Sequence, residues 1–488
     1  MIPKLNPELA LDVSITAYCK ALVAAGYTGD IETSYASRLA VATDNSIYQA
    51  LPQAVLLPKT TDDLVILTSL AQTSSFSHIK FSPRGGGTGT NGQSLTEHVV
   101  VDLSRHMRNI LEINVEERWV RVQAGVIKDQ LNAFLKPYGF FFAPDLSTSN
   151  RATIGGMINT DASGQGSLVY GKTSDHVLAL KTVLIDGNVL KTHKMATFEA
   201  EHRAEMPNSI GRIYRQVLDS CREHRVQILE KFPRLNRFLT GYDLEHVFND
   251  DLSEFDLSRI ITGSEGSLGF VVEAKLNITP IAKFKCLVNV KYNSFESALR
   301  NAPFLVAADA TSVETVDSKV LNLARADIIW HQVKDLITDV PGVDMQGLNM
   351  VEYNSEQQQD IEQKVASLTA RLDQAIAESR DGIIGYQLTY DNAAINSIYA
   401  MRKKAVGLLG NTQGAQKPLA FAEDTAVPPE NLADFILEFR ALLDAHGLHY
   451  GMFGHVDAGV AASDVPGTGE SRRLCIRLAH LRHDRAAS

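Results

Sequence analysis

The alternation of hydrophobic and polar positions divides the chain into a strand-rich first part and a second part in which longer helices alternate with strands. Apolar residues at helical spacing predict a helical N-terminal segment over 1–45. Short apolar runs between polar turns then predict strands, and the stretch between about 200 and 256 is helix-rich. This irregular order predicts a mixed α+β protein rather than a regular βαβ series. The expected strands are 54–57, 79–81, 99–101 and 119–122, followed by a helix over 128–138.

A second pattern begins near residue 283 and predicts a separate domain. Alternating strands and helices of this kind are typical of helices packed on one face of an antiparallel sheet. We therefore expect a second α+β domain from about residue 282. Its expected strands are 286–290 and 311–316, and its expected helices are 295–305, 357–379, 396–407 and 429–446.

Composition excludes several functional classes. With 488 residues, of which 44% are hydrophobic and 21% charged, the chain is long enough for two or three globular domains. Its formal net charge of −10 argues against non-specific nucleic-acid binding, although a basic pocket for an anionic substrate stays open. The four cysteines are widely scattered without a C-x-x-C pair, which supports neither a disulfide framework nor an iron–sulfur cluster.

Targeting signals are not evident in the sequence. The N-terminal residues lack the apolar core of a signal peptide, and no apolar run is long enough to span a bilayer. We therefore expect a cytoplasmic protein without a transmembrane segment, and attachment to the surface of the inner membrane stays open.

The most informative motif is the glycine-rich stretch 83–92, which reads PRGGGTGTNG. Glycine backbones can adopt positive φ and approach a ligand closely, and successive N–H groups in such a turn suit an anion such as a phosphate. Gly87, Gly89 and Gly92 match the pattern G-x-G-x-x-G, but the chain continues into an expected strand instead of a helix. A Rossmann NAD site is therefore disfavoured, and the lack of a lysine after the glycines argues against a P-loop. A tight turn without a ligand is the remaining alternative.

Two further glycine-rich elements follow, 152–164 (ATIGGMINTDASG) and 262–273 (TGSEGSLGFVVE). Each alone could be an ordinary junction of a loop and a helix. In this order, and with the first loop, they resemble the flavin-binding domain of the vanillyl-alcohol-oxidase (PCMH-type) superfamily over about 44–280. The resemblance implies that the first loop holds the pyrophosphate of FAD, that the second element and 170–175 border the ADP and isoalloxazine, and that the third contributes backbone contacts. The cofactor-binding residues implied in this way are Arg84, Gly85, Gly86, Gly87, Thr88, Gly89, Thr90, Thr153, Gly155, Gly156, Asn159, Gly164, Gly171, Asp175, Glu265, Gly266 and Val271.

The first loop also indicates how the flavin is held. Some relatives attach FAD covalently through a histidine in this loop. Gly86, Gly87 and Thr88 occupy that neighbourhood here, so covalent attachment at this point is excluded. The resemblance therefore implies non-covalent FAD.

The second expected domain carries candidate residues for substrate chemistry. Arg402 lies in YAMRKK on an expected helix, and Lys417 lies in QKP. These segments, with YGMFGH ending at His455, resemble the substrate cap of the D-2-hydroxy-acid dehydrogenases, a group that includes D-2-hydroxyglutarate and D-lactate dehydrogenases. By that resemblance Arg402 and Lys417 bind substrate carboxylates, a task suited to guanidinium and ammonium groups. Solvated surface charge is the alternative, and it is the preferred interpretation for Lys403 and Lys404.

His455 is the sharpest single candidate for catalysis. A neutral imidazole at the end of an aromatic-rich strand can ligate a metal or accept a proton. In the relatives this histidine helps to bind a divalent metal, Zn or Mn, that polarises the substrate hydroxyl. Where those relatives have a second histidine, seven residues later, this chain has Ala462, and a later Glu-His-Gly segment is missing. We therefore expect an incomplete metal site. A hydrogen-bonded loop histidine is the alternative reading of His455.

The last residues depart from the family pattern after about Val460. The stretch 461–488 contains five arginines and no lysine. We expect a divergent tail there, frameshifted or disordered, on a truncated chain. The sequence of 421–459 most resembles that of a bacterial flavoprotein that is fused to an iron–sulfur region.

These observations together predict an α+β fold in four segments: the helical segment 1–45, a PCMH-type FAD-binding domain of two α+β subdomains over 46–281, an incomplete FAD-linked oxidase C-terminal cap over 282–460, and the tail. The implied reaction is oxidation of a D-2-hydroxy acid to the 2-oxo acid by hydride transfer to the flavin. The electron acceptor would be a quinone, a flavoprotein or an iron–sulfur protein, with no nucleic-acid partner. The alternatives are a catalytically impaired FAD-binding fragment and, disfavoured by the cap residues, a reductase acting on a cell-wall UDP-sugar.

Overall fold

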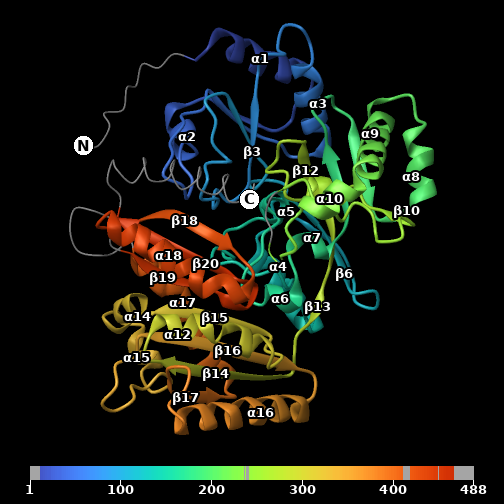
Figure 1. Cartoon of the computed structure of the whole chain (residues 1–488). Helices are drawn as coiled ribbons and strands as arrows, with labels where there is room; N and C mark the ends of the chain where they lie inside the picture. Colours follow the sequence, from blue (N-terminus) through green and yellow to red (C-terminus); the bar gives the residue numbers. More distant parts are fainter. Residues whose placement is uncertain (1–10, 236, 238–240, 410–417, 449, 467–488) are drawn as a thin grey trace. The chain divides into compact units, whose positions relative to one another are not determined.

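The chain divides into two units in the computed structural model, which describes residues 11–235, 237, 241–409, 418–448 and 450–466 (Figure 1). Unit 1 contains the described residues up to Ser163, those of 171–234 and those from 241 to Ile281. Unit 2 contains Gly164–Tyr170, Leu235, Arg237 and the described residues from Ala282 onward. The second unit thus includes short segments from the middle of the expected FAD-binding domain, which the sequence pattern did not predict.

A small mixed sheet lies at the N-terminal end of unit 1. Its strands, in order across the sheet, are β1 (Asp30–Glu32), β2 (Ala54–Leu57), β4 (Val99–Asp102) and β3 (Phe81–Arg84). The last three are parallel, which explains why β4 reads as an uninterrupted Val-Val-Val run that is buried on both sides. Helices α1 (Val13–Ala24) and α3 (Thr61–Ala71) share a hydrophobic core with this sheet.

The sequence pattern predicted a helical N-terminal segment over 1–45. Its described residues, from 11 onward, are not helical throughout. It contains α1 and α2 (Tyr35–Ala40), but β1 lies between them and pairs antiparallel with β2. The strand has the sequence Asp-Ile-Glu, and three residues are too few to show an alternating pattern. The segment is therefore an edge of the first sheet.

A larger antiparallel sheet forms the rest of the unit 1 scaffold. Its strands, in order, are β5 (Ile110–Asn114), β6 (Trp119–Gln123), β12 (Phe270–Asn277), β8 (Val177–Val183) and β9 (Val189–His193). One hydrophobic core joins this sheet to α4 (Lys128–Leu135), α5 (Ile154–Thr160) and α9 (Ser209–Glu223). The helix-rich stretch expected between about 200 and 256 is confirmed. The other elements of unit 1 are η1 (Lys136–Tyr138), β7 (Phe140–Phe141), α7 (Thr173–His176), β10 (Met195–Ala196), α8 (Thr197–Ala204), α10 (Arg225–Lys231), β11 (Glu254–Phe255), α11 (Ser258–Ile261) and β13 (Thr279–Pro280).

Unit 2 is built on one antiparallel sheet (Figure 1). Its strands, in order, are β17 (Ile383–Thr389), β14 (Phe284–Tyr292), β16 (Gly347–Ser355), β15 (Ser312–Asp317), β19 (Gly451–His455), β20 (Val460–Pro466) and β18 (Pro418–Ala426). Strand β20 pairs with both β18 and β19, so the first residues of the expected tail continue the sheet. The remainder of that expected tail, 467–488, lies outside the described residues.

Helices cover both faces of this sheet, and the expectation that they cover one face is wrong. The α16 face packs on α12 (Phe295–Arg300), α13 (Ala302–Val306), α16 (Gln358–Ala377) and α18 (Leu432–Ala445). The α17 face packs on α14 (Ser318–Arg325), α15 (Trp330–Val333) and α17 (Asn392–Leu409). The error has a physical cause: Asn289, Lys291 and Glu314 on the α17 face are polar yet buried, so their strands resemble strands with one face in water. The short elements left in unit 2 are α6 (Ser167–Tyr170), η2 (Pro429–Asn431) and η3 (Val456–Ala458).

The helices in the described part of the chain are those of two globular units. None of its helices is both long and apolar enough to cross a bilayer.

Candidate functional site

The first glycine-rich loop leaves the end of β3 and packs against the second glycine-rich element in unit 1. A Cβ atom at Gly85 would overlap the Thr153 side chain, and one at Gly86 would overlap the Arg151 carbonyl oxygen. Gly87 has φ +61°, a left-handed conformation that favours glycine. Glycine is therefore required here both for the turn and for the close approach of the two backbones.

Arg84, expected to bind the cofactor, is engaged by the protein itself. One terminal nitrogen, Nη1, donates to the Val41 carbonyl oxygen and to Ser94 Oγ, each at 3.2 Å, and Nη2 donates to the Thr43 carbonyl oxygen at 2.8 Å. Burial lowers the pKa of this guanidinium, which nevertheless stays charged because arginine titrates so far above neutral pH. Arg84 thus fixes the start of the loop that continues through Thr88, Gly89 and Thr90.

The second element forms the start of α5 and is held tightly on the larger sheet. Thr153 is the N-cap, and its Oγ1 accepts a hydrogen bond from the Gly156 N–H at 3.2 Å. The Gly155 N–H donates to the Ala124 carbonyl oxygen at 2.8 Å, and a Cβ at Gly155 would lie 2.8 Å from Ala124 Cβ. At the other end of the helix, Asn159 Oδ1 is buried with no hydrogen-bond partner among the described residues.

The third element closes on the first two. The Gly263 and Glu265 N–H groups donate to the carbonyl oxygens of Ile158 and Asn159, at 2.9 and 2.8 Å. Gly266 has φ +76°, and a Cβ there would overlap Pro83 of the first loop. Val271 follows on β12. The three glycine-rich motifs, far apart in sequence, are thus brought together in unit 1.

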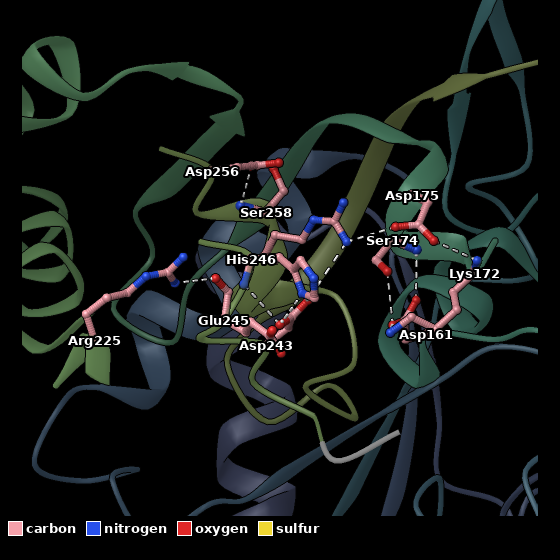
Figure 2. Close-up of polar contacts among 11 residues, drawn as sticks. Asp161, Lys172, Ser174, Asp175, Arg225, Asp243, Glu245, His246, Asp256 and Ser258 are labelled. Atoms are coloured by element: carbon pink, nitrogen blue, oxygen red, sulfur yellow. Dashed lines mark hydrogen bonds and ion pairs between the residues drawn. The ribbon is translucent and has the colours of Figure 1, made fainter. Parts of the chain in front are cut away.

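Asp175 lies at the exposed edge of a polar network beside α5 in which Asp161, Lys172 and Ser174 are buried, and Gly171 directly precedes Lys172 (Figure 2). Asp161, the C-cap of α5 with φ +47°, forms an ion pair with Lys172 Nζ at 2.8 Å and accepts the Ser174 N–H at 2.8 Å. Asp175 accepts the Lys172 N–H at 2.9 Å and Arg259 Nη1 at 3.1 Å. Arg259 lies on α11, immediately before the third motif, so the network ties the second motif to the third.

Two carboxylates beside Arg259 have pKa values below their usual range. Burial alone would raise the pKa of Asp175, but the Lys172 N–H and the Arg259 guanidinium outweigh it, and the pKa lies below its usual value. Asp243, 3.8 Å from Arg259 Nη1, behaves in the same way, chiefly because His246 donates to it. Asp243 in turn raises the pKa of His246.

In unit 2 the α17 face of the sheet carries a second buried charge cluster. Glu314 on β15 is 1% exposed, and its cross-strand partner in the register is His455 on β19. His455 Nδ1 contacts Glu314 Oε1, and Arg402 Nη2 on α17 lies 2.7 Å from Glu314 Oε2. The Arg402 guanidinium also lies over the Phe453 ring, with 5.1 Å between Cζ and the ring centroid. One carboxylate therefore engages two of the three residues that the sequence singled out in this domain.

The charge state of Glu314 determines the tautomer of His455. Burial alone would raise the pKa of Glu314, but the charges of His455, Arg402 and Arg237 together hold that pKa below its usual value. An ionised carboxylate can only accept hydrogen bonds, so the proton on the facing imidazole nitrogen belongs to His455 Nδ1. His455 contributes that positive charge only while both ring nitrogens carry protons, and Nε2 carries the lone pair once the ring is neutral.

Glu352 on β16 is a second buried acid on the same face. Gln165 Nε2 donates to Glu352 Oε2 at 2.9 Å, and Lys285 Nζ lies 3.5 Å from Oε1. Burial, followed by the charge of Glu352, raises the pKa of Tyr399 well above its usual value, so this phenol stays neutral. Gln165 belongs to the Gly164–Tyr170 segment of unit 2. Gly164 therefore lies in a different unit from the other predicted cofactor-binding residues, which belong to unit 1.

The remaining candidates divide in three ways. Lys417 lies outside the described residues. Lys404 is half-exposed and pairs with Asp327 at 2.6 Å, which fits the surface charge preferred for it. Within the described residues, no group of three or more His, Cys, Asp or Glu side chains is arranged to hold a metal ion, so no chemistry is assigned to a metal at His455.

Sequence reasoning missed Glu314, Glu352 and Gln165. Glu314 lies between Val313 and Thr315 in SVETVD, and an acid in the middle of a strand-like run was the available signal. Nothing local marks Glu352 or Gln165, because their contact joins positions 187 residues apart.

Similarity to known proteins agrees with this arrangement. Two protein-family models match the chain, the FAD binding domain over 52–193 and the C-terminal domain of FAD linked oxidases over 281–465. D-2-hydroxyglutarate dehydrogenases from Pantoea ananatis and Escherichia coli K12 are 62% and 60% identical to it over 460 residues. Those alignments cover 94% of this chain but 45% of each relative, so the chain spans less than half the length of these curated relatives.

More distant proteins align over most of the chain. The glycolate oxidase subunit GlcD of Bacillus subtilis is 25% identical over 457 residues, covering 91% of this chain and 80% of that protein. A solved structure of alkyldihydroxyacetonephosphate synthase aligns over 98% of this chain and 81% of its own, with TM-score 0.69 and 16% identity, which shows the fold alone. The α+β fold expected from the sequence is confirmed. The chain therefore belongs to the FAD-linked oxidases that combine a PCMH-type FAD-binding domain with the FAD-linked oxidase C-terminal domain.

Proposed function

We propose that the chain oxidises a D-2-hydroxy acid, of the D-2-hydroxyglutarate or D-lactate class, to the 2-oxo acid with non-covalently bound FAD. The observation that carries the proposal is the joint engagement of Arg402 and His455 by the buried Glu314. A guanidinium and an oriented imidazole on one sheet face are what recognition of a carboxylate and removal of a hydroxyl proton require. The name D-2-hydroxyglutarate dehydrogenase, carried by similar proteins, supports the substrate class.

Unit 1 has the features that FAD binding requires. A side chain at Gly85, Gly86 or Gly266 would fill space that the converging motifs use, and the bare N–H groups of such a turn suit a pyrophosphate. Asn159 Oδ1 is a buried acceptor that still lacks a donor among the described residues, and a bound flavin can supply one. FAD, when bound, accepts the hydride that leaves the substrate Cα.

Unit 2 supplies binding and proton transfer in the proposed reaction. Arg402 Nε is buried without a partner among the described residues, which leaves an N–H for a substrate carboxylate oxygen. We propose that Lys417 binds a carboxylate as well. His455 Nε2 accepts the hydroxyl proton, while the Cα–H bond breaks, two electrons leave with the hydride and the C–O bond becomes a carbonyl.

The proposal is tested by adding D-2-hydroxyglutarate without oxygen to the flavin-loaded chain. We expect the flavin absorbance near 450 nm to bleach, because the two electrons have no other acceptor. D-lactate tests the second substrate class, and the L-enantiomers are the controls. A yellow protein whose absorbance persists with every D-2-hydroxy acid would contradict the proposal and support the alternative, a flavin-binding chain without turnover.

The electron acceptor and the cellular location complete the proposal. We propose that a quinone, a flavoprotein or an iron–sulfur protein takes the electrons onward. Replacing oxygen with a soluble quinone in the same assay distinguishes the first of these from the others, because only that arm restores multiple turnovers. The cytoplasmic location stays a prediction of the sequence.

A further inference from the structure

Three buried donor groups on the α17 face of unit 2 have no hydrogen-bond partner among the described residues. They are the Ser312 hydroxyl on β15 and, on α17, the Tyr399 hydroxyl and Arg402 Nε. Each of these side chains is at least nine-tenths buried. An unpaired buried donor is costly and persists where a ligand completes it. The substrate carboxylate proposed above for Arg402 completes one of the three groups and leaves the two hydroxyls.

The two hydroxyls belong to one cluster. Ser312 and Glu352 are opposite each other in the antiparallel register of β15 and β16, which brings side chains on one face within contact distance. Burial, followed by Glu352, raises the pKa of Tyr399, and Ser312 opposes that rise, so Tyr399 lies within reach of both. The Tyr399 hydroxyl nevertheless has no partner that meets hydrogen-bond geometry among the described residues.

Glu352, the acid beside the two hydroxyls, is engaged elsewhere. Gln165 Nε2 donates to Glu352 Oε2 at 2.9 Å, and Lys285 Nζ lies 3.5 Å from Oε1. Both carboxylate oxygens therefore have other partners, and the lysine opposes the negative charge. The hydroxyls of Ser312 and Tyr399 remain as donors for an acceptor outside the described chain.

The position of the hydroxyls relative to His455 indicates which part of a substrate they meet. Glu314 is opposite His455 in the register of β15 and β19, and Ser312 is two residues away along β15, about 7 Å at the rise of an antiparallel strand. Tyr399 precedes Arg402 by three residues, a spacing that places both on one face of α17. A five-carbon dicarboxylic acid has a comparable length between its two carboxylates. An acid whose hydroxyl lies at His455 therefore reaches the two protein hydroxyls with its far end.

We propose that Tyr399 and Ser312 bind the distal carboxylate of the substrate, the one farther from the hydroxyl-bearing carbon. They thereby select a 2-hydroxy dicarboxylic acid over a 2-hydroxy monocarboxylic acid. This specificity role rests on the proposed function. Two hydroxyl donors suit the two oxygens of a carboxylate, and hydrogen bonds to a charged acceptor are stronger than neutral ones. A methyl group in the same place, as in D-lactate, leaves both donors unpaired.

Tyr399→Phe removes one of the two donors and tests the proposal. We expect kcat/KM for D-2-hydroxyglutarate to fall by about 10- to 100-fold, mainly through KM, because one hydrogen bond to a carboxylate is lost. The value for D-lactate should stay unchanged. Ser312→Ala should act in the same direction, and the double variant should lose less than the product of the two single losses if both hydroxyls hold one carboxylate. Anaerobic stopped-flow reduction of the bound flavin measures these values.

A second readout is independent of turnover. Titration calorimetry of the flavin-loaded chain with 2-oxoglutarate and with pyruvate compares a dicarboxylic with a monocarboxylic 2-oxo acid. In Tyr399→Phe, 2-oxoglutarate should bind about 10- to 100-fold more weakly, and pyruvate should bind as in the wild type. If the wild type fails to reduce its flavin but binds 2-oxoglutarate through Tyr399, the proposed function is wrong and the carboxylate site stands. If the wild type reduces its flavin and Tyr399→Phe keeps the preference for the dicarboxylic acid, the proposed function stands and the site is wrong.

Tyr353→Phe is the matched control. The Tyr353 hydroxyl is also buried without a hydrogen-bond partner among the described residues, but this side chain packs in the core on the α16 face of the same sheet. Removing an unpaired buried hydroxyl should not lower the unfolding temperature of either variant. The selectivity between the two classes of acid should change only in Tyr399→Phe. An equal change in both variants, or no change in Tyr399→Phe, would overturn the proposal.

Discussion

Two buried ion pairs, one in each unit, have similar distances but differ in whether their remaining polar atoms have hydrogen-bond partners. Asp161 and Lys172 in unit 1 meet at 2.8 Å, and Glu314 and Arg402 in unit 2 meet at 2.7 Å. None of the buried side-chain atoms of Asp161 or Lys172 lacks a hydrogen-bond partner in the described structure, and Asp161 also accepts the Ser174 backbone. Arg402, in contrast, keeps a buried N–H without a partner among the described residues.

We propose that this difference distinguishes a structural ion pair from one that belongs to a binding site. A fully satisfied buried network holds its segment in one conformation, here the turn that follows α5. A buried donor without a partner is costly and persists where a ligand completes it. The two pairs should therefore respond in opposite ways to substitution: the first through stability, the second through substrate kinetics.

The largest expected effect is on the stability of unit 1. Asp161→Ala removes the carboxylate that pairs with the buried Lys172 ammonium and places alanine in a left-handed conformation, so we expect a loss of about 3–5 kcal/mol in the free energy of unfolding. The chain has two tryptophans, Trp119 in unit 1 and Trp330 in unit 2. Urea unfolding followed by Trp119 fluorescence in a Trp330→Phe background measures the loss.

Asp161→Asn is the matched control for that loss. Asparagine tolerates the left-handed conformation and can still accept the Ser174 N–H, so it removes only the charge. It should cost less than alanine. Equal stability of wild type and Asp161→Ala would show that the ion pair in unit 1 does not contribute to the stability of this unit.

The next largest effect is on substrate binding in unit 2. Arg402→Lys keeps a positive charge near Glu314 but loses the planar fork, so we expect kcat/KM for D-2-hydroxyglutarate to fall by about 10²- to 10³-fold with flavin content unchanged. Stopped-flow reduction of the bound flavin measures it. Lys404→Ala on the same helix is the control, since its exposed pair with Asp327 should matter by less than about 1 kcal/mol. Similar kinetics for both variants would remove Arg402 from the site.

The same contrast explains how much could be predicted from the sequence. The three glycine-rich motifs were recognisable because each carries its signal within about a dozen neighbouring residues. Backbone hydrogen bonds, such as the one from Gly263 to Ile158, hold the three motifs together. The family resemblance implied that the motifs converge, whereas composition alone could not predict it. Arg402 and His455 were likewise found through local motifs.

The contacts that could not be predicted join residues that are far apart in the sequence. Glu314 meets His455 across 141 positions, and no local pattern distinguishes an acid that faces a covering helix from one that faces water. The same ambiguity hid the second helical layer, because Asn289 and Lys291 are buried polar residues. The contact of Gln165 with Glu352 in unit 2 could not be predicted, because Gln165 directly follows the second glycine-rich motif in the sequence.

A pH dependence of opposite sign should distinguish the acids of the two units. Burial, and then the charge of Glu314, raises the pKa of Asp457 in unit 2 to about 6, from 3.8. The folded state therefore binds this proton more tightly, and stability falls as pH rises from about 4 through 6. Asp457→Asn escapes that fall, so its stability relative to wild type should rise by up to about 3 kcal/mol between pH 4 and 7.5. Urea unfolding followed by Trp330 fluorescence measures the change.

Asp175 in unit 1 is the comparator for this pH dependence. Its pKa lies below the usual value, so its contribution to stability is present above about pH 4 and is lost as pH falls through the lowered pKa. Asp175→Asn should therefore lose ground to wild type as pH rises in the acid range, the reverse of Asp457→Asn. Parallel pH profiles for the two variants would mean that the two clusters do not differ in charge state as described.

The smallest expected effect tests the close approach of the glycine-rich motifs. A Cβ at Gly86 would overlap the Arg151 carbonyl oxygen, and backbone cannot swing aside as a flexible side chain can. Gly86→Ala should therefore cost about 1–3 kcal/mol of unit 1 stability and weaken FAD retention during gel filtration, because the first loop must move from the second. Gly385→Ala on β17 is the control, since among the described residues its Cβ would meet only Val340 Cγ2, at 3.3 Å, and alanine restricts the unfolded chain. If Gly86→Ala retains its flavin as well as Gly385→Ala does, the contact between the two motifs does not shape the cofactor site. The first loop would then be a tight turn without a ligand.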